Sequence, residues 1–239
     1  MELDRILGRN GQSICKALSN SELMAEFYLA GGTGLALQLG HRKSFDLDFF
    51  QKGKEEKIRF SEISREINRL FGVKRASLEF KQIDQVIWSI DGVKVTFLAY
   101  PFPLVYPLVP GGSIAGELDG IFLASQQEIA LMKAYALGRL ATFRDHIDLY
   151  FLLHHQIITL GDIIQEAASK FIIDGERVFS GRLFLEQLAY TQDVEDKEAS
   201  INLVTGEEGI SHIKVERFLK TQVQHFLDRH VMNNGGSAI

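Results

Sequence analysis

Residues 26–50, EFYLAGGTGLALQLGHRKSFDLDFF, decide the fold of this chain. The apolar run 26–30 ends at a glycine pair, a pattern typical of a buried strand that stops at a turn. The following segment is rich in Leu and Ala and ends at Gly40, which predicts a short helix. Residues 44–50 then alternate with period two and carry aromatic side chains, which predicts a second strand.

The flanking sequence extends this strand–helix–strand unit into a mixed sheet. Helical spacing predicts helices over 3–19 and 55–71. Two β-type runs follow, joined by Asp91-Gly92, a two-residue hairpin signal. All four prolines fall in 101–112, which we expect to be an irregular crossover.

The remainder of the chain is predicted to be helical. Helical patterns cover 125–139, 142–155, 161–171, 177–190 and 212–230, with a charged connection at 192–200. The predicted fold class is therefore α+β, a mixed sheet with flanking helices followed by a helical bundle. We expect an α/β domain over 1–110, a helical domain over 111–232 and a flexible tail over 233–239.

Composition describes an ordinary globular protein. The chain has 239 residues, of which 46% are apolar and 24% charged. It has no run of about 18 apolar residues, and its first residues lack a signal-peptide pattern, so we expect no membrane span and a cytoplasmic location. The single cysteine, Cys15, excludes an internal disulfide and is expected to be a packing residue.

Charge is distributed unevenly along the chain. Residues 1–100 have a net charge of +2 and residues 101–239 a net charge of −7, giving −5 overall. A nucleic-acid partner would therefore need a local basic surface. The candidates for that surface are Arg42, Lys43, Lys52, Lys54, Lys57 and Arg59.

Two aspartates interrupt the apolar pattern of the second strand. Asp46 and Asp48 are two residues apart, so they project from the same face, with Phe45, Leu47 and Phe49 expected on the opposite, core side. Two carboxylates this close repel each other, and a bound divalent cation removes that penalty. Mg²⁺, with Mn²⁺ as the alternative ion, suits such oxygen ligands and completes its shell with water and substrate phosphates.

The glycine turn supplies a complementary phosphate site. Gly31 and Gly32 open a helix, where backbone N–H groups and the helix dipole favour an anion. The Thr33 hydroxyl is a further donor, and Arg42 offers a forked donor for phosphate oxygens. Taken singly, Gly-Gly-Thr is a common strand-to-helix turn and Asp-x-Asp is often a solvated strand edge. Together they point to a phosphate-bearing substrate held with a divalent cation.

These residues resemble the nucleotidyltransferase superfamily related to DNA polymerase β, and more closely its AbiEii/AbiGii-type toxin family. Members of that family show Gly-Gly-Thr, a Leu/Ala helix, Gly-His-Arg and Ser-x-Asp-Leu-Asp-Phe-Phe. The segment EIALMKAYALGRLATFRDHIDLYFLL, 128–153, resembles the family's second block, Glu-Ile-x-x-x-Lys followed by Arg-Asp-x-x-Asp-Leu. The two blocks together span residues 28–153.

The resemblance implies Mg²⁺-dependent transfer of a nucleotidyl group from a nucleoside triphosphate. Asp46 and Asp48 would hold the metal, Lys133 would contact the triphosphate, and Asp145 would act as base or orient the acceptor. The nucleotide-binding set implied in addition is Ser44, Arg144 and Asp148. The residues alone leave alternatives open, because Lys133 also fits a surface lysine and Arg144 also fits a helix salt bridge with Asp148.

The family's biology implies particular partners. It includes toxins of toxin–antitoxin pairs, some implicated in phage defence, and some members nucleotidylate the 3′ ends of tRNA. We therefore expect an RNA acceptor, most specifically tRNA, and a cognate antitoxin.

One position departs from the superfamily pattern. Alternation along VKVTFLAY places Thr96 where many relatives carry a third acidic residue, and a threonine is not an anionic ligand. Three explanations compete: a single Mg²⁺, substitution by another acid such as Asp145, or a non-catalytic nucleotide- or partner-binding protein that keeps the fold.

Overall fold

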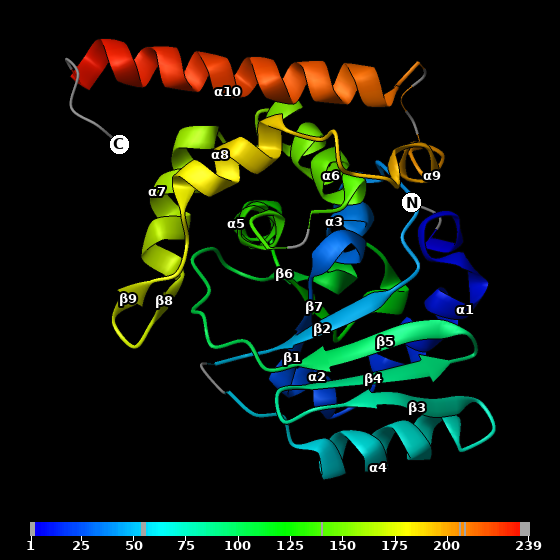
Figure 1. The fold of residues 1–239 in the computed structure, drawn as a ribbon. Helices are drawn as coiled ribbons and strands as arrows, with labels where there is room; N and C mark the ends of the chain where they lie inside the picture. Colours follow the sequence, from blue (N-terminus) through cyan, green and yellow to red (C-terminus); the bar gives the residue numbers. More distant parts are fainter. Residues whose placement is uncertain (1–2, 54–55, 140, 206, 208, 235–239) are drawn as a thin grey trace. The chain divides into compact units, whose positions relative to one another are not determined.

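The computed structural model divides the chain into two units, Met1–Ser125 and Gln126–Ile239, which are described separately (Figure 1). It describes residues 3–53, 56–139, 141–205, 207 and 209–234. The first unit contains a seven-stranded mixed sheet with flanking helices and the second is mainly helical, so the predicted α+β class is confirmed.

The sheet of the first unit is built around the segment 26–50. Its strands are β1 (Phe27–Leu29), β2 (Leu47–Gln51), β3 (Ala76–Lys81), β4 (Gln85–Ile90), β5 (Val93–Leu98), β6 (Val109–Pro110) and β7 (Phe122–Leu123). They are ordered β3-β4-β5-β2-β1-β7-β6. The pairs β2–β5 and β1–β7 are parallel and the others antiparallel. Asp91 and Gly92 have φ values of 48° and 80°, which confirms the predicted tight hairpin.

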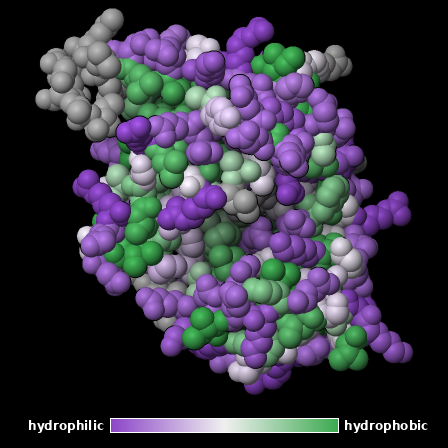
Figure 2. All heavy atoms as spheres, in the orientation of Figure 1, coloured by the Kyte–Doolittle hydropathy of each residue, from purple (hydrophilic) through white to green (hydrophobic). Residues whose placement is uncertain are grey.

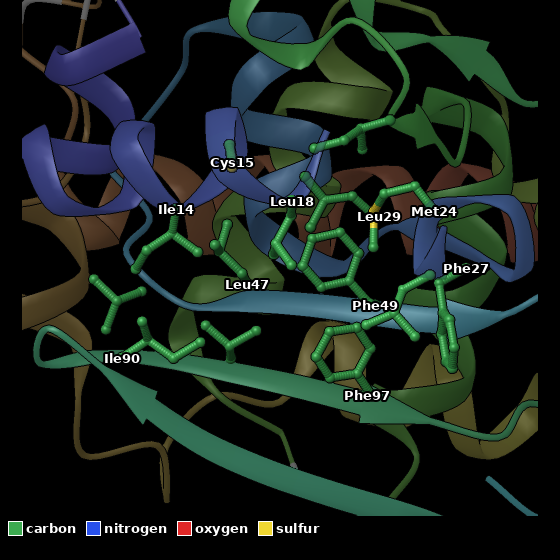
Figure 3. Packing of buried hydrophobic residues seen from close by; sticks show 14 of the residues in the cluster. Ile14, Cys15, Leu18, Met24, Phe27, Leu29, Leu47, Phe49, Ile90 and Phe97 are labelled. Atoms are coloured by element: carbon green, nitrogen blue, oxygen red, sulfur yellow. The ribbon is translucent and has the colours of Figure 1, made fainter. Parts of the chain in front are cut away.

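Four helices accompany this sheet: α1 (Leu3–Leu18), α2 (Leu23–Glu26), α3 (Gly31–Leu39) and α4 (Phe60–Phe71). Side chains of α1 and α2 pack on one face of β2 and β5 (Figure 3). There the rings of Phe49 and Phe97 stack at 5.2 Å. Cys15 is fully buried in the same core, and burial raises the pKa of its thiol to about 12, so its predicted packing role is confirmed.

Several details of the first unit differ from the sequence predictions; for example, α4 begins at Phe60 and not at residue 55. The unit extends to Ser125 and does not end at residue 110, because β6 and β7 return to the sheet and Leu123 pairs with Leu29 of β1. Phe45 is 47% exposed and does not lie on the core side, because β2 begins only at Leu47 and Phe45 belongs to the preceding loop.

The second unit is a helical bundle with one small hairpin. Its helices are α5 (Gln126–Leu137), α6 (Phe143–His154), α7 (Leu160–Lys170), α8 (Gly181–Ala189), α9 (Lys197–Ile201) and α10 (His212–Asn234). α9 lies within the predicted connection 192–200 and just beyond it. The hairpin β8 (Ile172–Ile173) and β9 (Glu176–Arg177) was not predicted; its turn, Asp174-Gly175, has two positive φ values. The predicted tail 233–239 lies outside the described residues, except 233–234, which belong to α10.

A buried ion pair lies inside the helical unit. Lys170, the last residue of α7, has its Nζ 2.6 Å from Oε1 of Glu128 on α5, and both side chains are 0% exposed. Burial lowers the pKa of Lys170, and the nearby Glu128 carboxylate opposes that shift. The pair therefore joins two helices through charges that water does not reach.

No helix in the described part of the chain combines the length and apolar character needed to cross a membrane. Hydrophobic and hydrophilic residues are interspersed on the face that Figure 2 shows.

Glu66 of α4 gives a prediction for acid stability. Its carboxylate accepts hydrogen bonds from Arg69 (2.7 and 2.6 Å) and from the Ser21 hydroxyl (2.8 Å). The Arg69 hydrogen bonds hold the Glu66 pKa at about 2, against 4.5 without these interactions. Because the folded pKa is depressed, the stabilisation is complete above pH 4.5 and is lost as the pH falls toward 2.

Urea unfolding of the wild type and of Glu66→Gln should therefore show a free-energy difference at pH 7 that shrinks steadily below pH 4.5. An equal difference at pH 7 and at pH 3 would contradict this assignment. Glu79→Gln, an exposed change in the same unit, is the matched control.

Candidate active site

The glycine turn and Asp48 meet where α3 follows β1. Gly31 begins the helix with φ +64°, a conformation that favours glycine. The Ala30 N–H donates to the Asp48 carbonyl at 3.0 Å, which fixes the turn against β2. A Cβ on Gly31 would lie 3.1 Å from Oδ2 of Asp48. The structure therefore places the Asp48 carboxylate against the start of a helix, whose first N–H groups have no acceptor within the helix.

Thr33 and Ser44 hold the loop that leads into β2. The Thr33 hydroxyl donates to the Asp46 carbonyl, and its Oγ1 lies 2.7 Å from the Ser44 hydroxyl. Because a threonine hydroxyl has a single proton, Ser44 is the donor in that second contact. In this arrangement both residues position Asp46, and Thr33 does not present a free proton to a phosphate.

Arg42 lies directly on the glycine turn. It is 2% exposed, and its Nη1 donates to the Lys43 carbonyl at 3.0 Å. A Cβ on Gly32 would be 2.0 Å from Nη2 of Arg42, so a side chain at position 32 would occupy the space of the guanidinium. A buried positive charge is therefore held against the turn that was predicted to bind phosphate.

Gly32→Ala is expected to displace Arg42 and to lower nucleotidyl transfer by about 100-fold, the cost of moving a positioning group by about 1 Å. Transfer rates with a labelled nucleoside triphosphate measure the effect. Gly116→Ala is the matched control, because Gly116 has no atom within 4 Å of its Cβ position and is not among the positive-φ glycines. Full activity in Gly32→Ala would show that Arg42 has no part in the site.

Thr96 lies beside Asp48, as predicted for the third acidic position. Asp48 of β2 and Thr96 of β5 are register partners in a parallel pair, so their side chains leave the same face of the sheet. Thr96 is 2% exposed, and within the described residues its Oγ1 has no hydrogen-bond partner. The position beside Asp48 is therefore polar but uncharged.

The carboxylates of Asp46 and Asp48 fit one hard cation. Among the described residues, no three His, Cys, Asp or Glu side chains gather into a metal-binding group. Mg²⁺ does not need such a group, because one or two carboxylates suffice when water and substrate phosphates complete its shell. Asp46 and Asp48, both half-buried, provide that number of carboxylates.

The second unit gathers the other predicted residues. Nζ of Lys133 on α5 is 2.6 Å from Oδ1 of Asp145 and 2.8 Å from Oδ2 of Asp148, both on α6, and all three residues are buried. Of the two alternatives left open for Arg144, the salt bridge with Asp148 does not form, and Asp148 pairs with Lys133. Arg144 is exposed, and it has no ion pair with any described residue.

Asp145 also has a structural task that the sequence analysis missed. It forms a capping box with Thr142 at the start of α6, in which the Thr142 hydroxyl donates to Oδ2 of Asp145 at 2.8 Å. The spacing Thr142-x-x-Asp145 is a recognisable form of this signal, with Asp in the usual place of Glu. Both oxygens of Asp145 therefore accept hydrogen bonds within the second unit.

Among the described members of the predicted basic surface, Lys43, Lys57 and Arg59 are exposed. Arg42 is buried, Lys52 donates to two carbonyls of α2, and Arg59 pairs with Glu26. Lys54 lies outside the described residues.

Comparison with known proteins identifies the family. The family described as nucleotidyl transferase AbiEii toxin of type IV toxin–antitoxin systems matches residues 13–113. An uncharacterized protein of Aquifex aeolicus, aq_aa25, is 32% identical over 203 residues, covering 85% of this chain and 89% of the relative. The chain belongs to the AbiEii nucleotidyltransferase toxin family. The predicted family and the predicted enzyme class, nucleotidyltransferase, are thereby confirmed.

Solved structures share the fold of this AbiEii chain. The nucleotidyltransferase toxin MenT4 of Mycobacterium tuberculosis matches with a TM-score of 0.60 and 16% identity, covering 91% of this chain and 81% of its own. JHP933 of Helicobacter pylori matches with a TM-score of 0.51 and 19% identity, covering 93% of both chains.

Proposed function

We propose that this AbiEii-family enzyme moves a nucleoside monophosphate from a nucleoside triphosphate to an acceptor hydroxyl, with Mg²⁺ (or Mn²⁺) as cofactor and the 3′ end of tRNA as acceptor. We further propose that it acts in the cytoplasm as the toxin of a toxin–antitoxin pair, with a role in phage defence and a cognate antitoxin as partner. The observation that carries the chemistry is the Asp48 carboxylate, 3.1 Å from where a Gly31 side chain would begin. That contact supports a single site for a metal-bound triphosphate.

Each candidate site residue of the first unit has a role in this proposed reaction. Backbone N–H groups at Gly31 and Gly32 bind phosphate oxygens, and Arg42 adds positive charge beneath them. Asp46 and Asp48 would hold Mg²⁺, which when bound supplies charge that stabilises the phosphates. The acceptor oxygen forms a bond to the α-phosphorus, the bond from that phosphorus to the bridging oxygen breaks, and pyrophosphate leaves. Positioning and electrostatics provide most of the catalysis in such transfers.

We also propose roles in the reaction for four residues of the second unit. Asp145 takes the acceptor proton or orients the acceptor hydroxyl, and for this it exchanges a hydrogen bond from Lys133 or Thr142 for one from the acceptor. Lys133 contacts the triphosphate by giving up one of its two carboxylate partners. Asp148 and the exposed Arg144 complete the proposed nucleotide-binding set together with Ser44.

An incorporation assay tests the transfer. Each α-labelled nucleoside triphosphate is incubated with the protein and total tRNA, with Mg²⁺ or with EDTA. We expect label on tRNA only when Mg²⁺ is present, loss of labelling in Asp46→Asn, and normal labelling in Asp84→Asn, an exposed aspartate of the same unit. Label on protein would refute the RNA acceptor. Nucleotide binding without any labelled product would favour the non-catalytic alternative, which the uncharged Thr96 position supports.

The toxin proposal is tested separately. Expression of the wild type should arrest growth, Asp46→Asn should not, and co-expression of the neighbouring gene product should restore growth. Growth arrest by both forms would separate toxicity from transfer.

A further inference from the structure

A cavity of about 480 Å³ lies between α6 and α10, entirely within the second unit. Its size falls in the range of about 300–1,000 Å³ that is usual for small-ligand sites. None of the residues assigned to transfer lines it. We call it the α6–α10 cavity.

Aromatic rings form one part of its wall. The ring of His154 is parallel to that of Tyr150, at a centroid distance of 5.2 Å and an angle of 11°. Phe218 of α10 meets both rings edge-on, at 5.5 Å from His154 and 5.1 Å from Tyr150. Tyr150 is buried, whereas His154 is exposed and Phe218 half-buried. The wall therefore offers accessible ring surface on a buried aromatic support.

Basic side chains form the other part. Lys214 and Arg217 both line the cavity and both are exposed. Lys214 is paired with Glu207 at 2.7 Å, so its charge is largely compensated. Arg217 has no ion-pair partner within the part of the chain that the structure describes, and it is therefore the main source of uncompensated positive charge at the cavity.

The basic character continues along α10. Lys214, Arg217 and Lys220 follow one another at intervals of three residues, all exposed, and Glu216 between them is paired with Lys197 at 2.8 Å. This basic row stands out because residues 101–239 carry a net charge of −7. Lys220 lines a different pocket, beside α8, whereas Lys214 and Arg217 lie at the ring-lined cavity. Cations beside accessible rings match the two requirements of single-stranded nucleic acid, phosphate contact and base stacking.

We propose that the α6–α10 cavity binds an unpaired nucleotide of a single-stranded RNA segment, namely of the acceptor in the proposed transfer reaction. The base stacks on the exposed ring of His154, with the Phe218 ring edge-on to it, and the neighbouring phosphate pairs with Arg217. This inference rests on the proposed function for the identity of the strand, but binding of the strand is measurable without transfer.

The test is a titration of a fluorescently labelled, short single-stranded RNA followed by anisotropy, at several salt concentrations and without nucleoside triphosphate. His154→Ala should weaken binding by about 5- to 100-fold, the loss typical of one stacked base, and should leave the salt dependence unchanged. Arg217→Ala should reduce the slope of log K against log salt by about 0.7, the value for one phosphate contact on a single strand. Arg177→Ala, an exposed arginine of β9, is the matched control and should change neither quantity.

Conservative variants keep the test informative if an alanine variant folds poorly. His154→Phe retains a ring and should retain affinity, and Arg217→Lys retains the charge and should retain the salt slope. The proposal is overturned if His154→Ala and Arg217→Ala bind RNA like the wild type, if the wild type binds no single-stranded RNA, or if a mononucleotide competes as well as the RNA strand. RNA binding through the cavity by a protein that transfers nothing would support this inference and refute the proposed function.

Discussion

Asp48→Asn is expected to lower the rate of nucleotidyl transfer by about 100- to 1,000-fold, the usual cost of removing one preorganised electrostatic contact from a transition state. The amide has nearly the same shape as the carboxylate but lacks its negative charge, so it is a poor ligand for a hard cation. Because Asp48 is half-buried near the start of β2 and is not one of the buried core residues, the thermal midpoint of unfolding should change little.

The measurement pairs transfer rates with thermal unfolding for three proteins: wild type, Asp48→Asn and Asp84→Asn. Raising the Mg²⁺ concentration should recover part of the activity of Asp48→Asn if Asp46 still holds the ion, and should not affect Asp84→Asn. If Asp48→Asn transfers nucleotide at the wild-type rate, the metal-holding role of this carboxylate is wrong. If activity and stability fall together, the role is structural.

Lys170→Met is expected to have the opposite signature, a large loss of stability with no direct effect on the first unit. The substitution leaves Glu128 fully buried without its cation, and such a change typically costs about 3–5 kcal/mol. Urea unfolding monitored by circular dichroism measures the loss.

The double variant Glu128→Leu, Lys170→Met provides the control for this prediction. It replaces both charges with apolar side chains of similar size, and replacing a buried pair in this way is often neutral or stabilising. The double variant should therefore unfold at a higher urea concentration than Lys170→Met alone. A double variant as unstable as the single one would show that loss of packing, and not the buried charge, causes the effect.

Local patterns were enough to predict the candidate site in the first unit. The glycine turn, the helix after it and the Asp-x-Asp strand are contiguous in sequence, so their periodicity determines which side chains share a face. Alternation along the later strand also placed Thr96 correctly, because the register of β5 beside β2 follows from the same period of two.

Contacts between distant segments could not be predicted in this way. The partner of Glu128 is Lys170 on another helix, and no local pattern links them. The pairing of β7 with β1 depends on a single register position, Leu29 with Leu123, which is too short to produce an alternating signal. The burial of Arg42 likewise depends on its packing against Gly32 at the start of α3, and no sequence pattern shows that contact.

The contact between Arg42 and Gly32 has a consequence for how this family can vary. Because a Cβ at position 32 would overlap the guanidinium, a side chain at position 32 requires the end of the Arg42 side chain to move. A homologue with alanine or serine at position 32 is expected to carry a smaller residue at position 42, and each single change should be less active than the pair. Variants of the glycine turn should therefore be designed with positions 32 and 42 changed together.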